Sequence, residues 1–496
     1  MSNRRLLREW SALLILGAGF SAQARPASDP DVIIQNVTVI SPERPRPRFH
    51  TDVLVRNGRI SKIGMNLVAG PHSERVDGSG RFLIPGLIDS HVHAGHSAAL
   101  DDDAIDAHPE LWAAYREQVP RAYLAFGFTS VVDLDLKQSD QSWFDSAPLR
   151  PRLYSCGAGI KIAGGYMAFK VPPPGSKGFP NIVYEPKEAD HWPKSLEPAD
   201  YTAEDAVSRA AGAGAICVKV FVESGFGTFN WPYLHTETLQ QIGAAAKRRN
   251  LVLMVHATGV DSWRSALDAH ADVIAHGLWI WPGDIGNPTP SAAVNELIAA
   301  AGRAGVRVQP TLQTVAGERA MIDPAILDDP RLAFALPMGV VAFLRSPEGV
   351  KSRTAALDEY RKASPSPGFE PLLAATIERT HATLKIMLRD HVALIFGSDT
   401  PGVDGFGNPP GLNGRLELQN WAEAGVPLSQ ILRAATLDNA KAMGLSRELG
   451  SIEVGKRADL LLLKGDPLSN ISAYDSIDVI FLDGKQIQRG ALRARD

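Results

Sequence analysis

The fold of this chain is decided by the stretch IPGLIDSHVH, residues 84–93. Its apolar run, Phe82 to Ile88, predicts a buried strand, and His91 and His93 follow with one residue between them. Alternate side chains of a strand point to the same side, so one metal ion can take both imidazoles. Such a pair also occurs at ordinary strand ends, and a metal site therefore needs further ligands from elsewhere in the chain.

Length and charge narrow the class of protein. The 496 residues, 45% of them hydrophobic, suffice for one large domain with an appendage or for two to three ordinary domains. The formal net charge of -4 and the mixed distribution of charges provide no basic patch for a polyanion. We expect a small-molecule substrate and no nucleic-acid partner, and we leave open whether the protein is a homo-oligomer.

Residues 1–24 have the pattern of an export signal peptide. The apolar run Trp10 to Phe20 follows several arginines and precedes Ala22-Gln23-Ala24, a cleavage pattern of small residues. The run has about half of the ~20 residues that a spanning helix needs, so a retained membrane anchor is the weaker alternative. We expect a periplasmic or secreted protein that begins near Arg25, exported by the Sec or the twin-arginine route.

The sequence contains two cysteines, Cys156 and Cys217. An oxidising compartment would permit a disulfide between them. Both lie in apolar, strand-like runs, and we therefore expect two buried thiols rather than a bridge.

The two terminal segments, residues 25–85 and 441–496, alternate short β-rich runs with turns such as Asn57-Gly58 and Asp483-Gly484. We expect them to form one small β-sandwich domain together. Between them, residues 86–440 alternate short apolar strands with helical stretches, the pattern of a (β/α)8 TIM barrel, which is an α/β fold. The eight expected strands are Leu87 to His93, Thr129 to Leu134, Arg152 to Cys156, Ala215 to Phe221, Leu251 to His256, Asp272 to His276, Val306 to Pro310 and Val392 to Asp399.

Two connections, Lys161 to Asp200 and Gly317 to Phe369, are too long for simple loops. We expect insertions or lids over the mouth of the barrel there, and these should decide the choice of substrate.

Five chemically active side chains fall at or near the carboxyl ends of separate expected strands. In a barrel these ends converge at the mouth, where catalytic groups lie. Core packing alone does not explain five such positions. The residues are His93, Lys219, His256, His276 and Asp399.

Lys219 says more than the other four about which kind of metal site the chain forms. It lies inside an apolar strand, where the loss of solvation favours the neutral amine. A neutral amine can add carbon dioxide, and the resulting carbamate could bridge two divalent ions as a carboxylate does. The alternative is an ammonium group that pairs with Asp399 or Glu223.

With these features the chain resembles the amidohydrolase superfamily from about residue 31 to its end. The resemblance rests on the histidine pair after residues 84–89, Lys219 in Val-Lys-Val-Phe, His256, His276 and Gly397-Ser398-Asp399. It rests also on the C-terminal stretches 435–440 and 450–460. Within the superfamily, the position of Lys219 resembles the binuclear branch related to imidazolonepropionase and Xaa-Pro dipeptidases.

The resemblance implies a ligand set for two divalent ions, with zinc as the expected metal. His91, His93 and Asp399 would hold one ion, His256 and His276 the other, and carbamylated Lys219 would bridge them. It also implies a bridging hydroxide that attacks a carbonyl while Asp399 acts as general base and then as general acid. Ser398 is then structural rather than nucleophilic.

The resemblance implies cleavage of a C–N amide or peptide bond in a dipeptide or an N-acyl amino acid. Tyr166 and Lys161 lie in mouth-side loops and are candidates for binding the substrate. A lactone or organophosphate ester hydrolase is a near alternative. A mononuclear deaminase or imidazolone hydrolase would leave Lys219 without a purpose, and a barrel that only binds its ligand would not need the whole ligand set.

Overall fold

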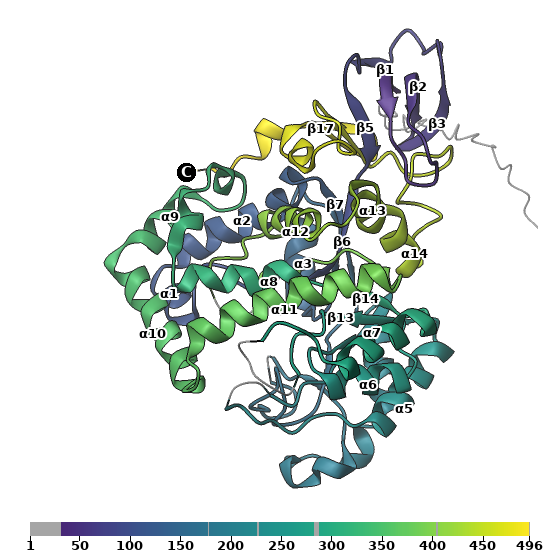
Figure 1. The fold of residues 1–496 in the computed structure, drawn as a ribbon. Coiled ribbons are helices and arrows are strands. Elements are labelled where there is room, and N and C mark those ends of the chain that lie inside the picture. Colours follow the sequence, from purple (N-terminus) through teal and green to yellow (C-terminus); the bar gives the residue numbers. More distant parts are fainter. Residues whose placement is uncertain (1–30, 177, 226–227, 282–286, 403–404, 496) are drawn as a thin grey trace, which may run out of the picture.

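The computed structural model describes residues 31–176, 178–225, 228–281, 287–402 and 405–495 (Figure 1). The expected signal peptide, residues 1–24, lies outside the described residues, so export remains a prediction. None of the helices in the described ranges combines the length and the hydropathy that a bilayer crossing requires.

The central part of the chain forms the expected α/β barrel, whose eight strand candidates all contain strands of the structure. Three parallel strands form one sheet in the order β6-β7-β8, and the other five lie in a second parallel sheet, in the order β11-β12-β13-β14-β15. Two short strands of the first insertion, β9 and β10, extend the second sheet beyond β11. The strands are β6 (Leu87–Val92), β7 (Phe128–Asp133), β8 (Arg152–Ser155), β9 (Ile160–Lys161), β10 (Asn181–Ile182), β11 (Cys217–Phe221), β12 (Val252–His256), β13 (Val273–Ala275), β14 (Arg307–Gln309) and β15 (Ala393–Leu394).

Backbone hydrogen bonds join the two sheets of the barrel. On one side, the Asp399 N–H donates to the His91 carbonyl at 2.7 Å, so the chain after β15 lies beside β6. On the other side, the Ile216 N–H donates to the Ser155 carbonyl at 2.9 Å, which connects β11 with β8. The eighth strand is shorter than expected, because β15 ends at Leu394, and Asp399 itself has a φ of 57°, outside the strand conformation.

The prediction of two free thiols is wrong, because Cys156 and Cys217 form a disulfide. Cys156 directly follows β8, and Cys217 is the first residue of β11. The two residues thus face each other across the join between the sheets, where the Ile216–Ser155 hydrogen bond also lies. The apolar surroundings that suggested buried thiols are real, since both side chains are fully buried.

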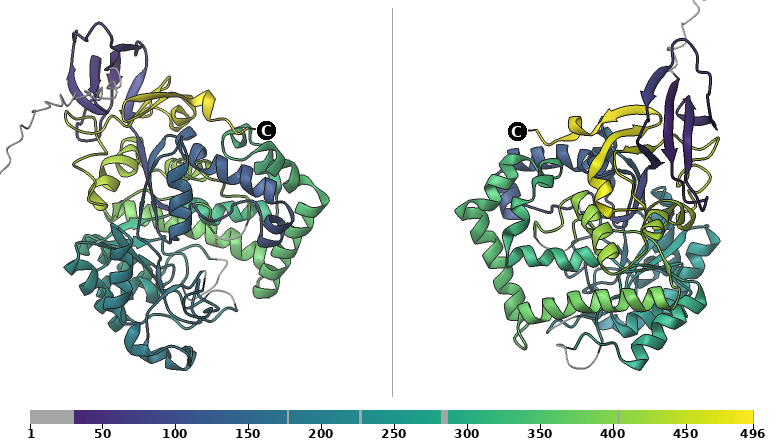
Figure 2. Two further views of the ribbon diagram at one scale, coloured as in Figure 1. Left: turned by 180° about the vertical axis from the view of Figure 1, so that it is seen from behind. Right: turned by 45° about the horizontal axis from the view of Figure 1, so that its top comes forward.

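The terminal segments form an eight-stranded sheet to which both ends of the chain contribute (Figures 1 and 2). Strand β5, which directly precedes the barrel, pairs on one side with β1 and on the other with β16. In both figures the purple and the yellow segments lie together at one end of the molecule. The strands are β1 (Val32–Val39), β2 (Arg48–Arg56), β3 (Arg59–Gly64), β4 (Glu74–Asp77), β5 (Phe82–Pro85), β16 (Leu460–Leu463), β17 (Ile477–Leu482) and β18 (Lys485–Gln488).

A single glycine separates the terminal sheet from the barrel. Gly86 lies between β5 and β6, and a Cβ atom at this position would overlap the side chain of Thr129. The absence of a side chain therefore lets β6 start directly beside β7.

Helices cover the outside of the barrel, and their ends follow local sequence signals. Ser291 caps α7 by accepting a hydrogen bond from the Val294 N–H, and Gly305 ends that helix with a φ of 70°. The second insertion forms helices α9 and α10 and leads into α11. The helices are α1 (Asp102–Ala107), α2 (Pro109–Ala125), α3 (Gln138–Ser146), α4 (Ala203–Gly212), α5 (Thr236–Arg248), α6 (Val260–Asp268), α7 (Ala292–Ala304), α8 (Leu312–Gly317), α9 (Met338–Arg345), α10 (Pro347–Ala363), α11 (Phe369–Arg389), α12 (Leu412–Glu423), α13 (Leu428–Arg433) and α14 (Asn439–Ala442).

Candidate metal centre

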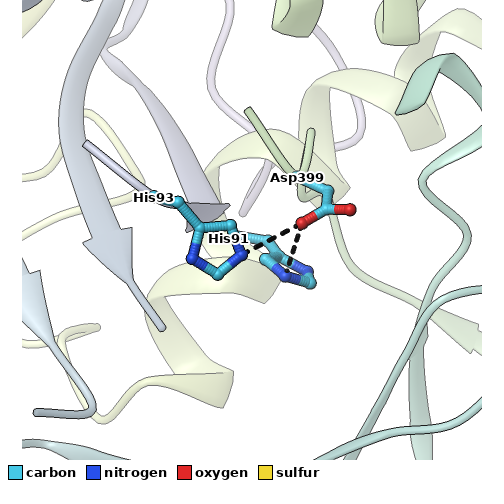
Figure 3. A group of neighbouring side chains, drawn as sticks. All are labelled: His91, His93 and Asp399. Carbon is cyan, nitrogen blue, oxygen red and sulfur yellow. Dashed lines mark hydrogen bonds and ion pairs between the residues drawn. The ribbon is translucent and has the colours of Figure 1, made fainter. Parts of the chain in front are cut away.

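Three of the predicted ligands form a compact group at the mouth of the barrel (Figure 3). Oδ1 of Asp399 lies 3.0 Å from Nε2 of His91 and 3.2 Å from Nε2 of His93. All three residues are buried. Their ligand atoms lie within 4.8 Å of one another, which is close enough to share one metal ion. The alternation of β6 therefore presents both imidazoles to the same carboxylate, as the sequence predicted.

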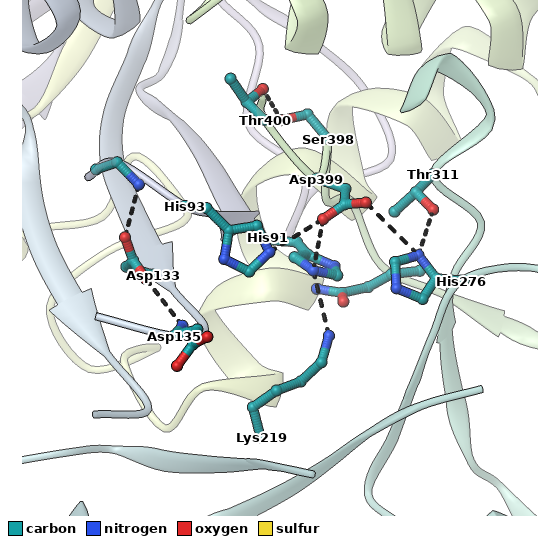
Figure 4. Close-up of polar contacts among 12 residues, drawn as sticks. His91, His93, Asp133, Asp135, Lys219, His276, Thr311, Ser398, Asp399 and Thr400 are labelled. Atoms are coloured by element: carbon teal, nitrogen blue, oxygen red, sulfur yellow. Dashed lines mark hydrogen bonds and ion pairs between the residues drawn. The ribbon is translucent and has the colours of Figure 1, made fainter. Parts of the chain in front are cut away.

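Lys219 lies in the middle of β11 and is completely buried. Its Nζ atom lies 3.2 Å from Nε2 of His91 (Figure 4). Burial lowers the pKa of Lys219 to about 7, so a substantial share of the amine is neutral near neutral pH. Glu223, one of the two carboxylates considered as its partner, instead accepts a hydrogen bond from Thr258 and lies 3.5 Å from Nε2 of His256.

His276 and His256, the ligands predicted for the second ion, lie beside the group of His91, Asp399 and Lys219. Nδ1 of His276 lies 2.9 Å from Oγ1 of Thr311 and 3.9 Å from Oδ2 of Asp399. The rings of His256 and His276 are 4.5 Å apart between centroids, and the rings of His91 and His276 are 5.1 Å apart. The structure thus brings together side chains from strands β6, β11 and β12 and from the residues that follow β6, β13 and β15.

The protonation states of three imidazoles and of the carboxylate suit a metal site, whereas Asp399 raises the pKa of His93 against the effect of burial. Burial lowers the pKa of His91 to about 3 and also lowers the pKa of His256 and of His276. These imidazoles are therefore neutral at pH 7, which is the form that binds metal ions. Burial by itself would raise the pKa of Asp399, but the neighbouring His91 and His93 hold it well below its usual range, so the carboxyl group is ionised.

The donor set fits a divalent metal ion. Nε2 of His91 and Nε2 of His93 both face the same carboxylate oxygen of Asp399. Nε2 of His256 is buried without a hydrogen-bond partner, with the Glu223 carboxylate 3.5 Å away. Buried polar atoms are normally satisfied, so this nitrogen indicates a missing partner. Imidazole nitrogens together with a carboxylate are ligands that suit zinc and neighbouring first-row ions.

A buried network that the sequence reasoning missed holds the loop of Asp399 against β6. Asp89 accepts hydrogen bonds from the Ser398 N–H at 2.9 Å and from the Ser398 hydroxyl at 2.6 Å. The Ser398 hydroxyl also lies 2.5 Å from Oγ1 of Thr400. Asp89 and Ser398 fix the two backbone segments that carry the ligands. The acidic residue Asp89, next to the apolar run that ends at Ile88, was the available signal for this role.

A second network lies on the other side of β6. Asp133, the last residue of β7, accepts a hydrogen bond from the Ala94 N–H at 2.7 Å, directly after His93. Asp135 forms a salt bridge of 2.7 Å with Lys161. Lys161, predicted as a substrate-binding residue, is thus buried and engaged by a carboxylate.

Tyr166, the other predicted substrate-binding residue, lies beside the ligand group. Its ring centroid is 5.0 Å from that of His256. Tyr166 also lines a cavity of about 280 Å³ that reaches His256, His276 and Asp399 at its inner end. Through this cavity a small molecule can reach the ligand group.

The sequence suggested Glu223 only as a possible partner of Lys219, and it did not predict the cavity walls. Glu223 lies two residues beyond β11 and lines the cavity beside His256. A carboxylate directly after the strand of Lys219 was its signal. Phe369 and Leu373, in contrast, line the cavity from α11 and carried no signal, because apolar residues at helical spacing are typical of any buried helix face.

The structure of the chain is similar to solved enzyme structures over nearly its whole length. A Xaa-Pro dipeptidase with bound methionine has a TM-score of 0.62 at 20% sequence identity, with 92% of this chain and 100% of that chain covered. Molinate hydrolase has a TM-score of 0.65 at 19% identity, with 95% and 97% covered. At these identities the similarity establishes the fold.

Sequence comparison adds a family assignment. The dihydroorotase of Trichlorobacter lovleyi is 39% identical over 83 residues, which are 16% of this chain and 16% of that protein. Such curated relatives therefore match over a small part of their length. The profile of the amidohydrolase family, in contrast, matches residues 82–487, which include the ligand strands and part of the terminal sheet. The chain belongs to the amidohydrolase family.

Proposed function

We propose that this protein is a metal-dependent hydrolase that cleaves an amide bond of a small substrate, a dipeptide or an N-acyl amino acid. The observation that carries the proposal is the convergence of His91, His93, Lys219, His276 and Asp399 from separate parts of the barrel. In the family, divalent metal ions are typical. The cavity that ends at these residues supports a small substrate, because its volume of about 280 Å³ suits a small molecule better than an extended peptide.

His91, His93 and Asp399 would hold one divalent ion, and His256 and His276 would hold a second. Lys219, as a carbamate formed with carbon dioxide, would bridge the two ions, which we expect to be zinc. When bound, such ions lower the pKa of a water molecule and polarise a carbonyl group. The complete burial of Lys219 and its contact with His91 support the carbamate.

Asp399 is the proposed proton carrier. Its carboxylate is ionised and faces the imidazoles of His91 and His93, so it can accept a proton from the attacking water. It can then deliver that proton to the leaving nitrogen, which combines the general base and general acid roles in one residue. The hydrogen bond from the backbone of Asp399 to His91 fixes the position from which both transfers occur.

We also propose that the protein is exported to the periplasm or secreted. Disulfides form and persist in oxidising compartments, and the Cys156–Cys217 disulfide supports such a location.

Replacement of Lys219 tests the metal site. We expect Lys219→Met, which keeps much of the side-chain volume but cannot form a carbamate, to lose at least one of two bound ions per chain. We expect hydrolysis of a panel of dipeptides and N-acyl amino acids to fall by at least about 100-fold, since the nucleophile depends on the ions. Metal content by mass spectrometry and turnover of the panel are the measurements.

Lys385→Ala is the matched control, because Lys385 is exposed on α11, away from the ligands. It should leave both metal content and turnover unchanged. A Lys219→Met protein that retains two ions and full activity would contradict the bridging role. A wild-type protein that binds two ions but hydrolyses no member of the panel would contradict the proposed substrate class.

A further inference from the structure

The cavity beside the candidate metal centre has two chemically different ends. Its inner end consists of polar groups, among them His256, His276 and Asp399. The rest of its lining is mostly apolar, with the aromatic side chains of Trp279 and Phe369, and also includes the charged residues Glu318 and Arg379. A substrate that reaches the ligands must therefore place another part of itself against an apolar surface.

The apolar walls come from regular elements rather than from loose loops. Tyr360 belongs to α10, whereas Phe369 and Leu373 belong to α11. Phe369 and Leu373 are buried in one hydrophobic cluster with Trp279 and Val315, and Tyr360 packs against that cluster. The ring centroids of Tyr360 and Phe369 are 5.1 Å apart. Packing of this kind fixes the shape of the walls before a substrate binds.

Aromatic side chains continue from the cavity to the surface. Phe229, which lines the cavity, is 42% exposed, and the nearby Phe169 is 54% exposed. The rings of both lie 5.3 Å from that of Trp231, which lies 5.3 Å from Tyr166. A group of exposed aromatic side chains at the rim of a pocket is typical of a surface that receives an apolar ligand.

We propose that this cavity is a specificity pocket for an aromatic amino-acid side chain of the substrate. This inference rests on the proposed function and assigns its substrate class. The ring would stack among Trp279, Tyr360 and Phe369 while the amide bond lies at the inner end. Edge and offset contacts between aromatic rings add binding free energy beyond that from the burial of their surface. Leu373 closes the wall and limits the size of the group that is accepted.

Paired substrates that differ in one side chain test the pocket. We expect kcat/KM of the zinc-loaded enzyme for N-acetyl-L-phenylalanine to exceed that for N-acetylglycine by roughly 10- to 100-fold, as burial of one aromatic side chain predicts. Leu373→Trp, which fills the cavity, should lower kcat/KM for the phenylalanine compound at least about tenfold and change that for the glycine compound less than about threefold. Leu373→Ala should widen the pocket and improve a naphthyl-alanine analogue relative to phenylalanine.

Ala374→Trp is the matched control, because Ala374 is the next residue of α11 and is exposed. It should leave the preference unchanged. Equal rates of the wild type on both compounds would overturn the pocket, as would an equal loss on both compounds in Leu373→Trp at normal metal content. Should neither compound be hydrolysed, the proposed activity fails, and calorimetric binding then decides the pocket. Tighter binding of N-acetyl-L-phenylalanine than of N-acetylglycine supports it, and equal binding overturns it.

Discussion

Ser398 and Asp399 are neighbours in the chain, but their side chains face different partners. The Ser398 hydroxyl donates to the buried carboxylate of Asp89. The carboxylate of Asp399 faces the imidazoles of His91 and His93. A hydroxyl that is engaged in this way is a positioning group, whereas the carboxylate is placed to accept and donate a proton.

This difference predicts that one substitution lowers stability and the other lowers kcat. Ser398→Ala removes a donor from a buried carboxylate and should lower the free energy of unfolding by about 1–3 kcal/mol. Its kcat should remain within about tenfold of the wild type. Asp399→Asn should lower kcat by roughly 100- to 10,000-fold, because the amide cannot accept the proton. Denaturant unfolding and initial rates measure the two effects, and a folded, metal-replete Ser398→Ala protein without activity would contradict the assignment.

Individual ligands could be predicted to the extent that a strand pattern places them. His91, His93 and Lys219 follow from apolar runs whose alternation fixes the direction of each side chain. Asp399 could be predicted as a residue but not in its conformation, because a φ of 57° depends on the bonds that its loop makes with β6. Lys161 lies near the mouth, but its salt bridge with Asp135 depends on a loop path that no local pattern encodes.

At the scale of elements, helix α12 supports the ligand group from outside. Helix α8 starts at Leu312 after Thr311, whose side chain makes no cap bond to the helix and instead contacts His276. Glu417 of α12 caps the N-terminus of α8 instead, because it accepts hydrogen bonds from the N–H groups of Leu312 and Gln313. The start of α8 therefore depends on a residue of another helix.

Glu417 should make stability depend on pH. Burial raises the pKa of Glu417 to about 7, well above the value of about 4.3 expected in the unfolded chain. The folded state then binds the proton more tightly, so this group stabilises the fold at low pH and loses that contribution as pH rises through 7. Relative to Glu417→Gln, the wild type should lose on the order of 3 kcal/mol of unfolding free energy between pH 5 and pH 8. Urea unfolding of both proteins at pH 5 and pH 8 measures this loss. If the difference in unfolding free energy between wild type and Glu417→Gln is the same at both pH values, the N–H donors keep the carboxylate ionised.

Elements with strong local signals could be predicted closely, and those fixed by distant contacts could not. Helix α7 (Ala292–Ala304) has strong local signals, since apolar spacing, a serine cap and a terminal glycine agree. The first residue of helix α11, Phe369, is held by a tertiary contact, because it packs into the cavity wall. The Cys156–Cys217 disulfide was missed because it depends on how two strands meet in space.

At the scale of the whole molecule, one arginine connects the barrel with the terminal sheet. Arg152 of β8 lies 2.9 Å from the carboxylate of Asp459 and also pairs with Asp483 in the turn between β17 and β18. The side chain of Asp459 is only 2% exposed. Removal of the arginine would leave this buried carboxylate without its cation.

Arg152→Ala should therefore lower the free energy of unfolding by about 3–5 kcal/mol, as expected when one partner of a buried ion pair is removed. Arg150→Ala is the matched control. Arg150 lies two residues earlier and pairs with Asp145 at the surface, so its loss should cost less than about 1 kcal/mol. Thermal and denaturant unfolding of both variants measure the difference, and equal stability of the two would contradict a structural role of Arg152 between the two parts.

The pairing of β5 with β16 also affects how the chain folds during its synthesis. Leu83 of β5 pairs with Leu462 of β16, about 380 residues later. At roughly 5–20 residues per second, a ribosome needs tens of seconds to supply that partner. For this time β5 has an open edge and part of its apolar surface is uncovered, a state that is prone to aggregation. Chaperone supply and the rate of translation should therefore govern the yield of active protein, and a stop codon shortly before residue 460 should yield insoluble material.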